Sequence, residues 1–149
     1  MQSFQTTLSA MLRRTSVSLL AATLAACSSA PAQPATQAPI TVSLTNFAMA
    51  ASTTSAKAGN VTFVATNNAP GIQHELIIIK TDLAADKLTV ESDNKVNEDA
   101  VQKLGEVSEL DSTKTGTVTL NLTAGHYALI CNIAGHYSQG MHVDFTVNP

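Results

Sequence analysis

The chain has 149 residues, of which 44% are hydrophobic and 4% aromatic, and its formal net charge is −3. This length can bury one hydrophobic core and predicts one folded domain, packed from aliphatic side chains because the chain has no Trp. The mild acidity and the lack of a basic cluster argue against a nucleic-acid partner.

The first 27 residues have the pattern of a targeting segment. Two arginines precede the apolar run VSLLAATLAA (17–26), which is too short to span a membrane and suits the core of a signal sequence. The run ends in LAAC, which resembles the bacterial lipobox, so we expect residues 1–27 to be a lipoprotein signal peptide with Cys27 lipidated. Cleavage by an ordinary signal peptidase is the alternative and would leave a soluble periplasmic protein. Translation from Met11 is also possible, because the ten residues before it carry no charge.

Residues 28–39, SSAPAQPATQAP, are small, polar and rich in Pro. Such a segment has too little apolar surface to fold and predicts a tether between an anchor and a domain at 40–149. If Cys27 carries lipid, Cys131 has no disulfide partner in an oxidising compartment. Metal ligation would explain a lone Cys there.

From residue 40 onward the pattern is typical of β-strands. The segment ITVSLTNF (40–47) alternates apolar and polar residues, and a turn at 58–60 leads into a second alternating segment at 61–67. Residues 76–79 are continuously apolar, which predicts a strand covered on both faces. The alternating segments 117–122 and 127–131 predict two further strands.

The segment between residues 81 and 115 holds most of the charge and few apolar repeats. Asn97 followed by two acidic residues is typical of a helix start, so we expect a short helix over Asn97–Leu104. The remainder is predicted to be a solvated flap with no chemical role. Seven or eight short strands and one helical excursion therefore predict an all-β, antiparallel sandwich.

The most informative motif is CNIAGHYSQGM at 131–141. Cys131, His136 and Met141 follow one another at five-residue intervals. Thiolate and thioether ligands select soft metals, and two imidazoles, one thiolate and a weak axial Met form the blue-copper site. His74, immediately before the apolar run, is the best candidate for the second imidazole. The alternative is a buried structural Cys with a His and a Met nearby by chance.

Three stretches resemble the cupredoxins, the small blue copper proteins: AGNVTFVATN (58–67), a His before a hydrophobic strand, and GHYALICNIAGHYSQGM (125–141). The C-x4-H-x4-M spacing is most similar to the branch that contains auracyanin, rusticyanin and sulfocyanin. This resemblance implies a Greek-key sandwich that binds one copper ion per chain, cycling between Cu(I) and Cu(II). The implied ligands are His74, Cys131, His136 and Met141.

The family resemblance also implies where electrons enter and leave. In cupredoxins the His of the C-terminal loop is the electron port, which here is His136. The apolar residues expected to form a docking patch around it are Ile133, Ala134, Tyr137, Pro70 and Ile72. Many cupredoxins have Asn or Ser directly after the first His ligand, linking the two ligand loops, whereas this chain has Glu75.

These observations favour an electron-transfer protein of the cell envelope, anchored to a membrane through lipid and expected to be a monomer. Its expected partners are cytochromes or other copper proteins. Four protein ligands leave no open position on the metal, so we expect no small-molecule substrate and no enzymatic activity. A periplasmic copper-binding or copper-delivery protein is the alternative, although such a protein would favour exposed Met and His clusters. A metal-free sandwich that acts in adhesion is a third possibility.

Overall fold

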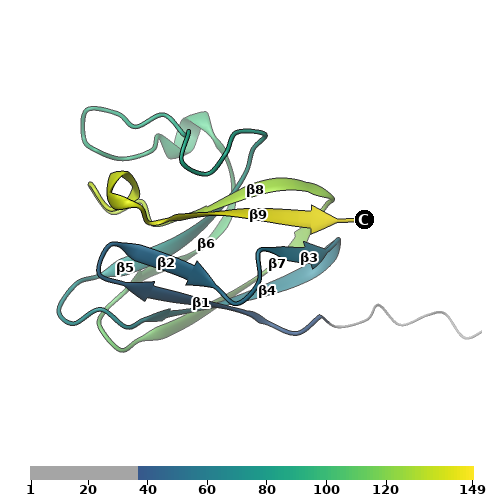
Figure 1. Ribbon diagram of the computed structural model, residues 1–149, viewed down its shortest axis with the longest axis horizontal. Coiled ribbons are helices and arrows are strands. Elements are labelled where there is room, and N and C mark those ends of the chain that lie inside the picture. Colours follow the sequence, from purple (N-terminus) through teal and green to yellow (C-terminus); the bar gives the residue numbers. More distant parts are fainter. Residues whose placement is uncertain (1–36) are drawn as a thin grey trace, which may run out of the picture. The chain divides into compact units, whose positions relative to one another are not determined.

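The computed structural model describes residues 37–149, which form two β-sheets that pack face to face (Figure 1). The predicted signal peptide, Cys27 and most of the predicted tether lie outside the described residues. The first sheet has the order β2-β1-β4-β7, with strands β1 (Ile40–Thr45), β2 (Ala48–Ala51), β4 (Gly59–Asn67) and β7 (Thr115–Leu122). The second has the order β3-β9-β8-β5-β6, with strands β3 (Ser55–Lys57), β5 (His74–Lys80), β6 (Gln102–Leu110), β8 (Gly125–Ile130) and β9 (His142–Asn148). Within residues 37–149, no helix is long and apolar enough to cross a membrane.

Alternation of apolar and polar residues places the main core between the two sheets. Strand β4 buries Val61, Phe63 and Ala65, and the residues between them are partly exposed on the opposite face. Phe63 meets Phe145 of β9 edge to face, with ring centroids 5.4 Å apart, so the two sheets are joined by an aromatic contact. The predicted all-β sandwich is confirmed.

The prediction of purely antiparallel sheets is wrong in two places, and residues 37–149 form nine strands where seven or eight were expected. Strand β1 pairs with β4 in parallel, and β3 pairs with β9 in parallel, whereas the other neighbouring strands are antiparallel. The cause is the short strand β3. After β2 the chain leaves the first sheet and forms β3 in the second sheet. It then returns to the first sheet as β4, which runs in the same direction as β1.

The segment Thr81–Val101, which we call the excursion, differs from the predicted solvated flap. Asn97 does cap a helical turn by accepting a hydrogen bond from the Asp99 N–H, but this 3-10 turn (η1) spans only Glu98–Ala100. The predicted helix to Leu104 is wrong, because β6 begins at Gln102 and pairs with β5.

The excursion also has its own small core. Its buried residues pack on the outer face of the second sheet, which explains why residues 76–79 are apolar without interruption: the strand is covered on both faces. The members of this second core are Ile77, Ile79, Ala85, Leu88, Val96, Ala128, Ile130 and Tyr137.

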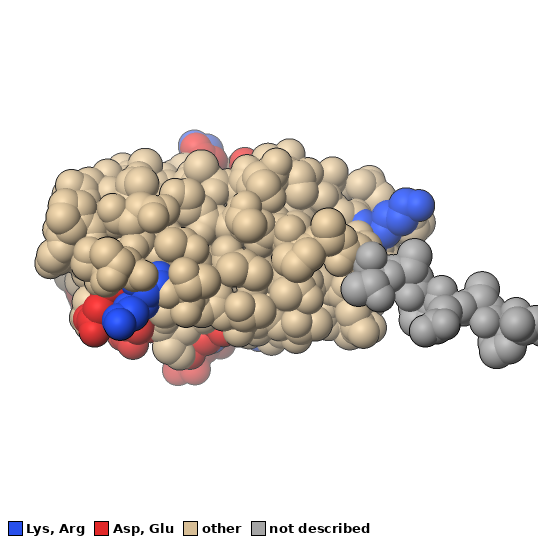
Figure 2. Space-filling view, turned by 90° about the horizontal axis from the view of Figure 1, so that it is seen from below, with Lys and Arg blue, Asp and Glu red and all other residues tan. Residues whose placement is uncertain are grey.

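Charge is distributed very unevenly between the two sheets. Strands β1, β2, β4 and β7 contain no charged residue. Figure 2 shows the molecule from the side of this sheet, and the face is almost free of Lys, Arg, Asp and Glu except near its edges. Most charged residues lie instead between Glu75 and Lys114.

Candidate metal centre

Strand pairing brings the first two candidate ligands to one end of the sandwich. His74 is the first residue of β5, and Cys131 directly follows β8. These two strands are antiparallel neighbours in which Ile77 pairs with Ile130, so the end of β8 lies beside the start of β5. Residues 57 positions apart in the chain are therefore in contact, and the Cys131 Sγ lies 3.8 Å from the His74 Nδ1.

A tight loop brings His136 and Met141 to the same place. The loop contains a 3-10 turn, η2 (Tyr137–Gln139), and its two glycines, Gly135 and Gly140, have φ angles of +83° and +108°. Side-chain-bearing residues rarely adopt such angles, so the turn depends on glycine at both positions. The loop closes where the Cys131 N–H donates to the Met141 carbonyl oxygen at 3.0 Å. Met141 is fully buried and belongs to the same core cluster as Cys131.

Three atoms with lone pairs face one another at this end of the sandwich. The Nδ1 atoms of His74 and His136 are 3.2 Å apart, and the Cys131 Sγ lies 3.5 Å from the His136 Nδ1. A single proton between these atoms can form a hydrogen bond within only one pair of them. Water offers little alternative, because His74 and Cys131 are wholly inaccessible to solvent and His136 is only 8% exposed. A cation between these atoms would satisfy all three lone pairs at once. The side chains therefore form a group that could hold a metal ion, with ligand atoms within 4.8 Å of one another.

Burial favours the neutral form of all three groups, which suits ligation by the imidazoles but not by the thiol. Desolvation lowers the pKa of His74, assisted by repulsion from His136, and desolvation likewise lowers the pKa of His136. Both imidazoles are therefore neutral near pH 7 and keep a lone pair. Burial raises the pKa of the Cys131 thiol, so a metal would have to displace its proton on binding.

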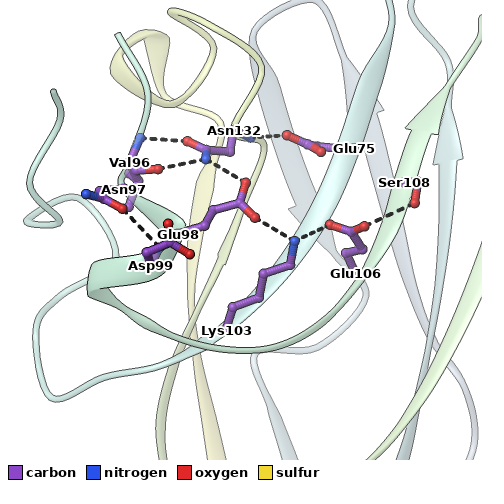
Figure 3. Close-up of polar contacts among 9 residues, drawn as sticks. All are labelled: Glu75, Val96, Asn97, Glu98, Asp99, Lys103, Glu106, Ser108 and Asn132. Atoms are coloured by element: carbon purple, nitrogen blue, oxygen red, sulfur yellow. Dashed lines mark hydrogen bonds and ion pairs between the residues drawn. The ribbon is translucent and has the colours of Figure 1, made fainter. Parts of the chain in front are cut away.

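Glu75 links the two ligand segments where many cupredoxins have Asn or Ser. Its backbone N–H lies 3.5 Å from the Cys131 Sγ, and its Oε1 accepts a hydrogen bond from the Asn132 N–H at 3.0 Å (Figure 3). The connection between the loops is therefore made by a carboxylate. Burial raises the pKa of Glu75 to about 7, with repulsion from Glu109 as the next contribution.

The residues predicted to form a docking patch differ in their exposure. Ala134 and Pro70 are exposed, and Ile133 and Ile72 are half-buried. Tyr137 is only 4% exposed, and its hydroxyl is bonded to the backbone of the excursion, so its predicted place in the patch is wrong. The 3-10 turn after His136 directs this ring to the second core.

Two residues near the site were not singled out from the sequence. Phe47, in the β1–β2 turn, meets the His136 ring edge to face with centroids 5.3 Å apart. Asn132 is 1% exposed and hydrogen bonds to Glu75, beside His74, and to Val96 of the excursion. Asn132 could have been identified from the sequence as a residue near the site, because it directly follows Cys131. Phe47 could not, because no local pattern indicates its contact with a residue 89 positions later.

Comparison with known proteins agrees with this geometry. A family model described as the sulfocyanin (SoxE) domain matches residues 38–149. No curated protein sequence matches the chain significantly.

Solved structures of auracyanins and rusticyanin share the fold. Dithionite-reduced auracyanin from Roseiflexus castenholzii has a TM-score of 0.60 and 20% identity, covering 73% of this chain and 95% of that chain. Auracyanin A, described as a "blue" copper protein from Chloroflexus aurantiacus, has a TM-score of 0.53 and 25% identity, covering 74% of this chain and 100% of that chain. Rusticyanin from Thiobacillus ferrooxidans has a TM-score of 0.56 and 16% identity, with coverages of 73% and 75%. The match over nearly the whole described domain shows that the chain belongs to the sulfocyanin family of cupredoxins.

Proposed function

We propose that this chain is a blue-copper electron-transfer protein that binds one copper ion through His74, Cys131, His136 and Met141. The observation that carries the proposal is the convergence of two imidazole nitrogens and one thiol sulfur within 4.8 Å at one end of the sandwich. This donor set, with a buried Met beside it, suits copper better than zinc, because Met is not a usual zinc ligand.

The chain's own residues hold the ligands and keep water out. Copper bound there would supply one-electron chemistry between Cu(I) and Cu(II). His74 is held by its place in β5. Cys131 is held by two hydrogen bonds: its N–H donates to the Met141 carbonyl oxygen, and its Sγ accepts from the Glu75 N–H. The ligands are thereby fixed before the metal binds, which limits rearrangement when the charge changes.

Electrons would pass through the edge of the site that approaches the surface. His136 is the one candidate imidazole with measurable exposure, and the Phe47 ring contacts its ring. The candidates for a docking surface at this edge are Phe47 and the expected residues Ile133, Ala134, Pro70 and Ile72, all exposed or half-buried. We infer that these residues form the docking patch for redox proteins such as cytochromes or other copper proteins. An apolar patch can release water readily and bring a partner close to the His136 ring.

The domain is proposed to work at the cell envelope. The LAAC sequence at 24–27 supports removal of a signal peptide and lipidation of Cys27, and the Pro-rich residues 28–39 would tether a monomeric domain of residues 40–149. At about 3 Å per residue in an extended form, such a tether would reach some tens of ångströms from the membrane.

Addition of Cu(II) to the purified metal-free protein tests the proposal. We expect an intense blue or green colour that reaches its maximum at one copper per chain and bleaches reversibly with ascorbate. A copper-delivery protein would instead lose its metal rapidly to an acceptor and transfer no electron. A protein that stays colourless with copper would refute the proposed site.

A further inference from the structure

Two of the three candidate ligands in the loop are each followed in the chain by a residue that reaches into the excursion. Asn132 follows Cys131, and Tyr137 follows His136. Both residues are buried, and neither side chain is directed into the cluster of candidate ligands. The excursion is therefore attached directly behind two ligands of the candidate metal centre.

The Asn132 side chain uses its full set of amide donors on the excursion. Its Oδ1 accepts from the Val96 N–H at 2.7 Å, and its Nδ2 donates to the Val96 carbonyl oxygen at 2.9 Å and to the Glu98 Oε1 at 3.0 Å (Figure 3). The Val96 N–H can only donate, which fixes the orientation of the amide. An Asp at this position would fit the same space but could donate neither of the other two bonds.

Tyr137 and Gly135 make the other connections between the loop and the excursion. The Tyr137 hydroxyl donates to the Ala85 carbonyl oxygen at 2.7 Å and accepts from the Leu88 N–H at 2.9 Å. The Gly135 N–H donates to the Asn94 carbonyl oxygen at 2.9 Å. Together with Asn132, these residues connect the ligand loop to the start, middle and end of the excursion.

The far side of the excursion is fastened to the second sheet. Glu98, which accepts from Asn132, also pairs with Lys103, and Lys103 pairs with Glu106 of β6 (Figure 3). The Val96 and Leu88 side chains lie in the second core against β5 and β8. The excursion is thus held by the same sheet whose strands carry His74 and Cys131.

We propose that the excursion is a clamp that positions Cys131 and His136 through Asn132 and Tyr137, and so slows the loss of copper. This inference rests on the proposed copper site. Residues that hydrogen bond behind metal ligands fix the orientation of those ligands, and their removal commonly costs tenfold or more in metal affinity. Asn132 and Tyr137 are positioning residues, because their side chains hold the ligands' backbone and leave the metal to the ligands themselves.

Tyr137→Phe tests the clamp, and Tyr127→Phe is its matched control. Each change removes one hydroxyl from a buried Tyr. The Tyr127 hydroxyl donates to the Thr123 carbonyl oxygen in the turn between β7 and β8, and not to the excursion or the ligand loop. The reduced, copper-loaded variants would be mixed with bathocuproine disulfonate, a Cu(I) chelator. We expect Tyr137→Phe to release copper roughly tenfold faster than the wild type and Tyr127→Phe to stay within about twofold.

Asn132→Asp is the second variant, and a further substitution at Glu98 should partly reverse its effect. The new carboxylate would face the Glu98 carboxylate and the Val96 carbonyl oxygen, so copper release should accelerate by roughly tenfold or more. Adding Glu98→Gln removes the like-charge contact and supplies an amide donor to the new carboxylate. The double variant should therefore release copper more slowly than Asn132→Asp alone.

Amide hydrogen exchange of the metal-free protein gives a readout that needs no copper. If the clamp exists, Tyr137→Phe should accelerate exchange at Leu88 and also at Val96 and Gly135, to which the Tyr137 hydroxyl makes no hydrogen bond. Wild-type release rates in both Tyr137→Phe and Asn132→Asp, or equal acceleration in Tyr127→Phe, would overturn the clamp. A wild-type protein that binds no copper would instead refute the proposed function, and the exchange pattern would still decide whether the clamp exists.

Discussion

The ring of Phe47 meets the ring of His136 edge to face, with centroids 5.3 Å apart and planes at 88°. Phe47 is 37% exposed, so one part of this aromatic ring contacts a candidate ligand while another part contacts solvent. Its φ of +54° is unfavourable for a side-chain-bearing residue by about 1 kcal/mol or more. Surface strain of this kind is often kept where it serves a functional contact, which supports a place for Phe47 in the docking patch.

Phe47→Ala should therefore slow electron exchange with a redox partner by roughly fivefold to tenfold, because aromatic residues at the centre of an interface contribute much of its binding energy. The absorption spectrum should stay nearly unchanged, since Phe47 offers no ligand atom. Leu83→Ala is the matched control, because Leu83 is the other large exposed hydrophobic residue in the described chain and belongs to the excursion. Stopped-flow mixing with a reduced partner measures both variants, and equal rates for Phe47→Ala and the wild type would remove Phe47 from the patch.

Ile133→Glu should reduce the same rate by about tenfold, because a partner would have to desolvate the new carboxylate on docking. Ile133 binds no metal in the proposed site, so copper content and spectrum should not change. Leu83→Glu places the same charge on an exposed apolar residue elsewhere and should leave the rate near that of the wild type. If both variants slow the reaction equally, overall charge and not docking at Ile133 is responsible.

Glu75 predicts a pH dependence of stability in the metal-free protein. Its pKa is raised from an ordinary value of 4.5 to about 7, mainly by burial, so the folded protein holds a proton that the unfolded chain has already released between these values. The free energy of unfolding should accordingly fall as the pH rises from about 4.5 to 7, by on the order of 3 kcal/mol from this group.

Glu75→Gln isolates this effect because the amide oxygen can still accept from the Asn132 N–H. The difference in unfolding free energy between wild type and variant, measured by urea denaturation across this range, should change in favour of the variant as pH rises. A constant difference from pH 4.5 to 7 would show that Glu75 titrates normally.

Much of the fold followed from local sequence patterns. Alternation predicted the sandwich, and the five-residue spacing of Cys131, His136 and Met141 predicted a loop that could hold a metal. The structure brings Cys131 and His136 together with His74, although their role as ligands stays a prediction. Local patterns were sufficient because the loop lies within eleven consecutive residues and His74 directly precedes a strand of unusual apolarity.

Features that depend on distant contacts could not be predicted. The parallel pairing of β1 with β4 depends on which sheet the three-residue strand β3 joins, and a segment that short has almost no periodicity. The excursion was interpreted as solvated because its charges are frequent, yet its few apolar residues meet an already apolar strand. Tyr137 was assigned to the surface because it lies beside His136, but the 3-10 turn begins at Tyr137 and its ring lies in the second core, whereas the His136 Nδ1 faces His74 and Cys131.

Cys27→Ala tests the proposed anchor. The variant should either leave the membrane fraction or remain unprocessed, because the thiol that would carry lipid is gone. Copper binding should be unaffected, since Cys27 precedes the matched domain at 38–149. Fractionation and intact-mass measurement decide the matter. Wild-type protein found wholly in the soluble fraction without lipid mass would contradict the anchor and favour a soluble periplasmic protein.

The most direct test of the metal centre is the visible absorption of copper-loaded Cys131→Ser beside that of the wild type. Thiolate-to-copper charge transfer is the source of the colour, and the wild-type protein should bind one copper per chain with intense visible absorption. Cys131→Ser leaves His74, His136 and Met141 in place but removes the only sulfur that can become a thiolate in the described domain. The account predicts that this variant loses the intense band even where it retains some copper. A variant that stays blue would show that the metal is bound elsewhere.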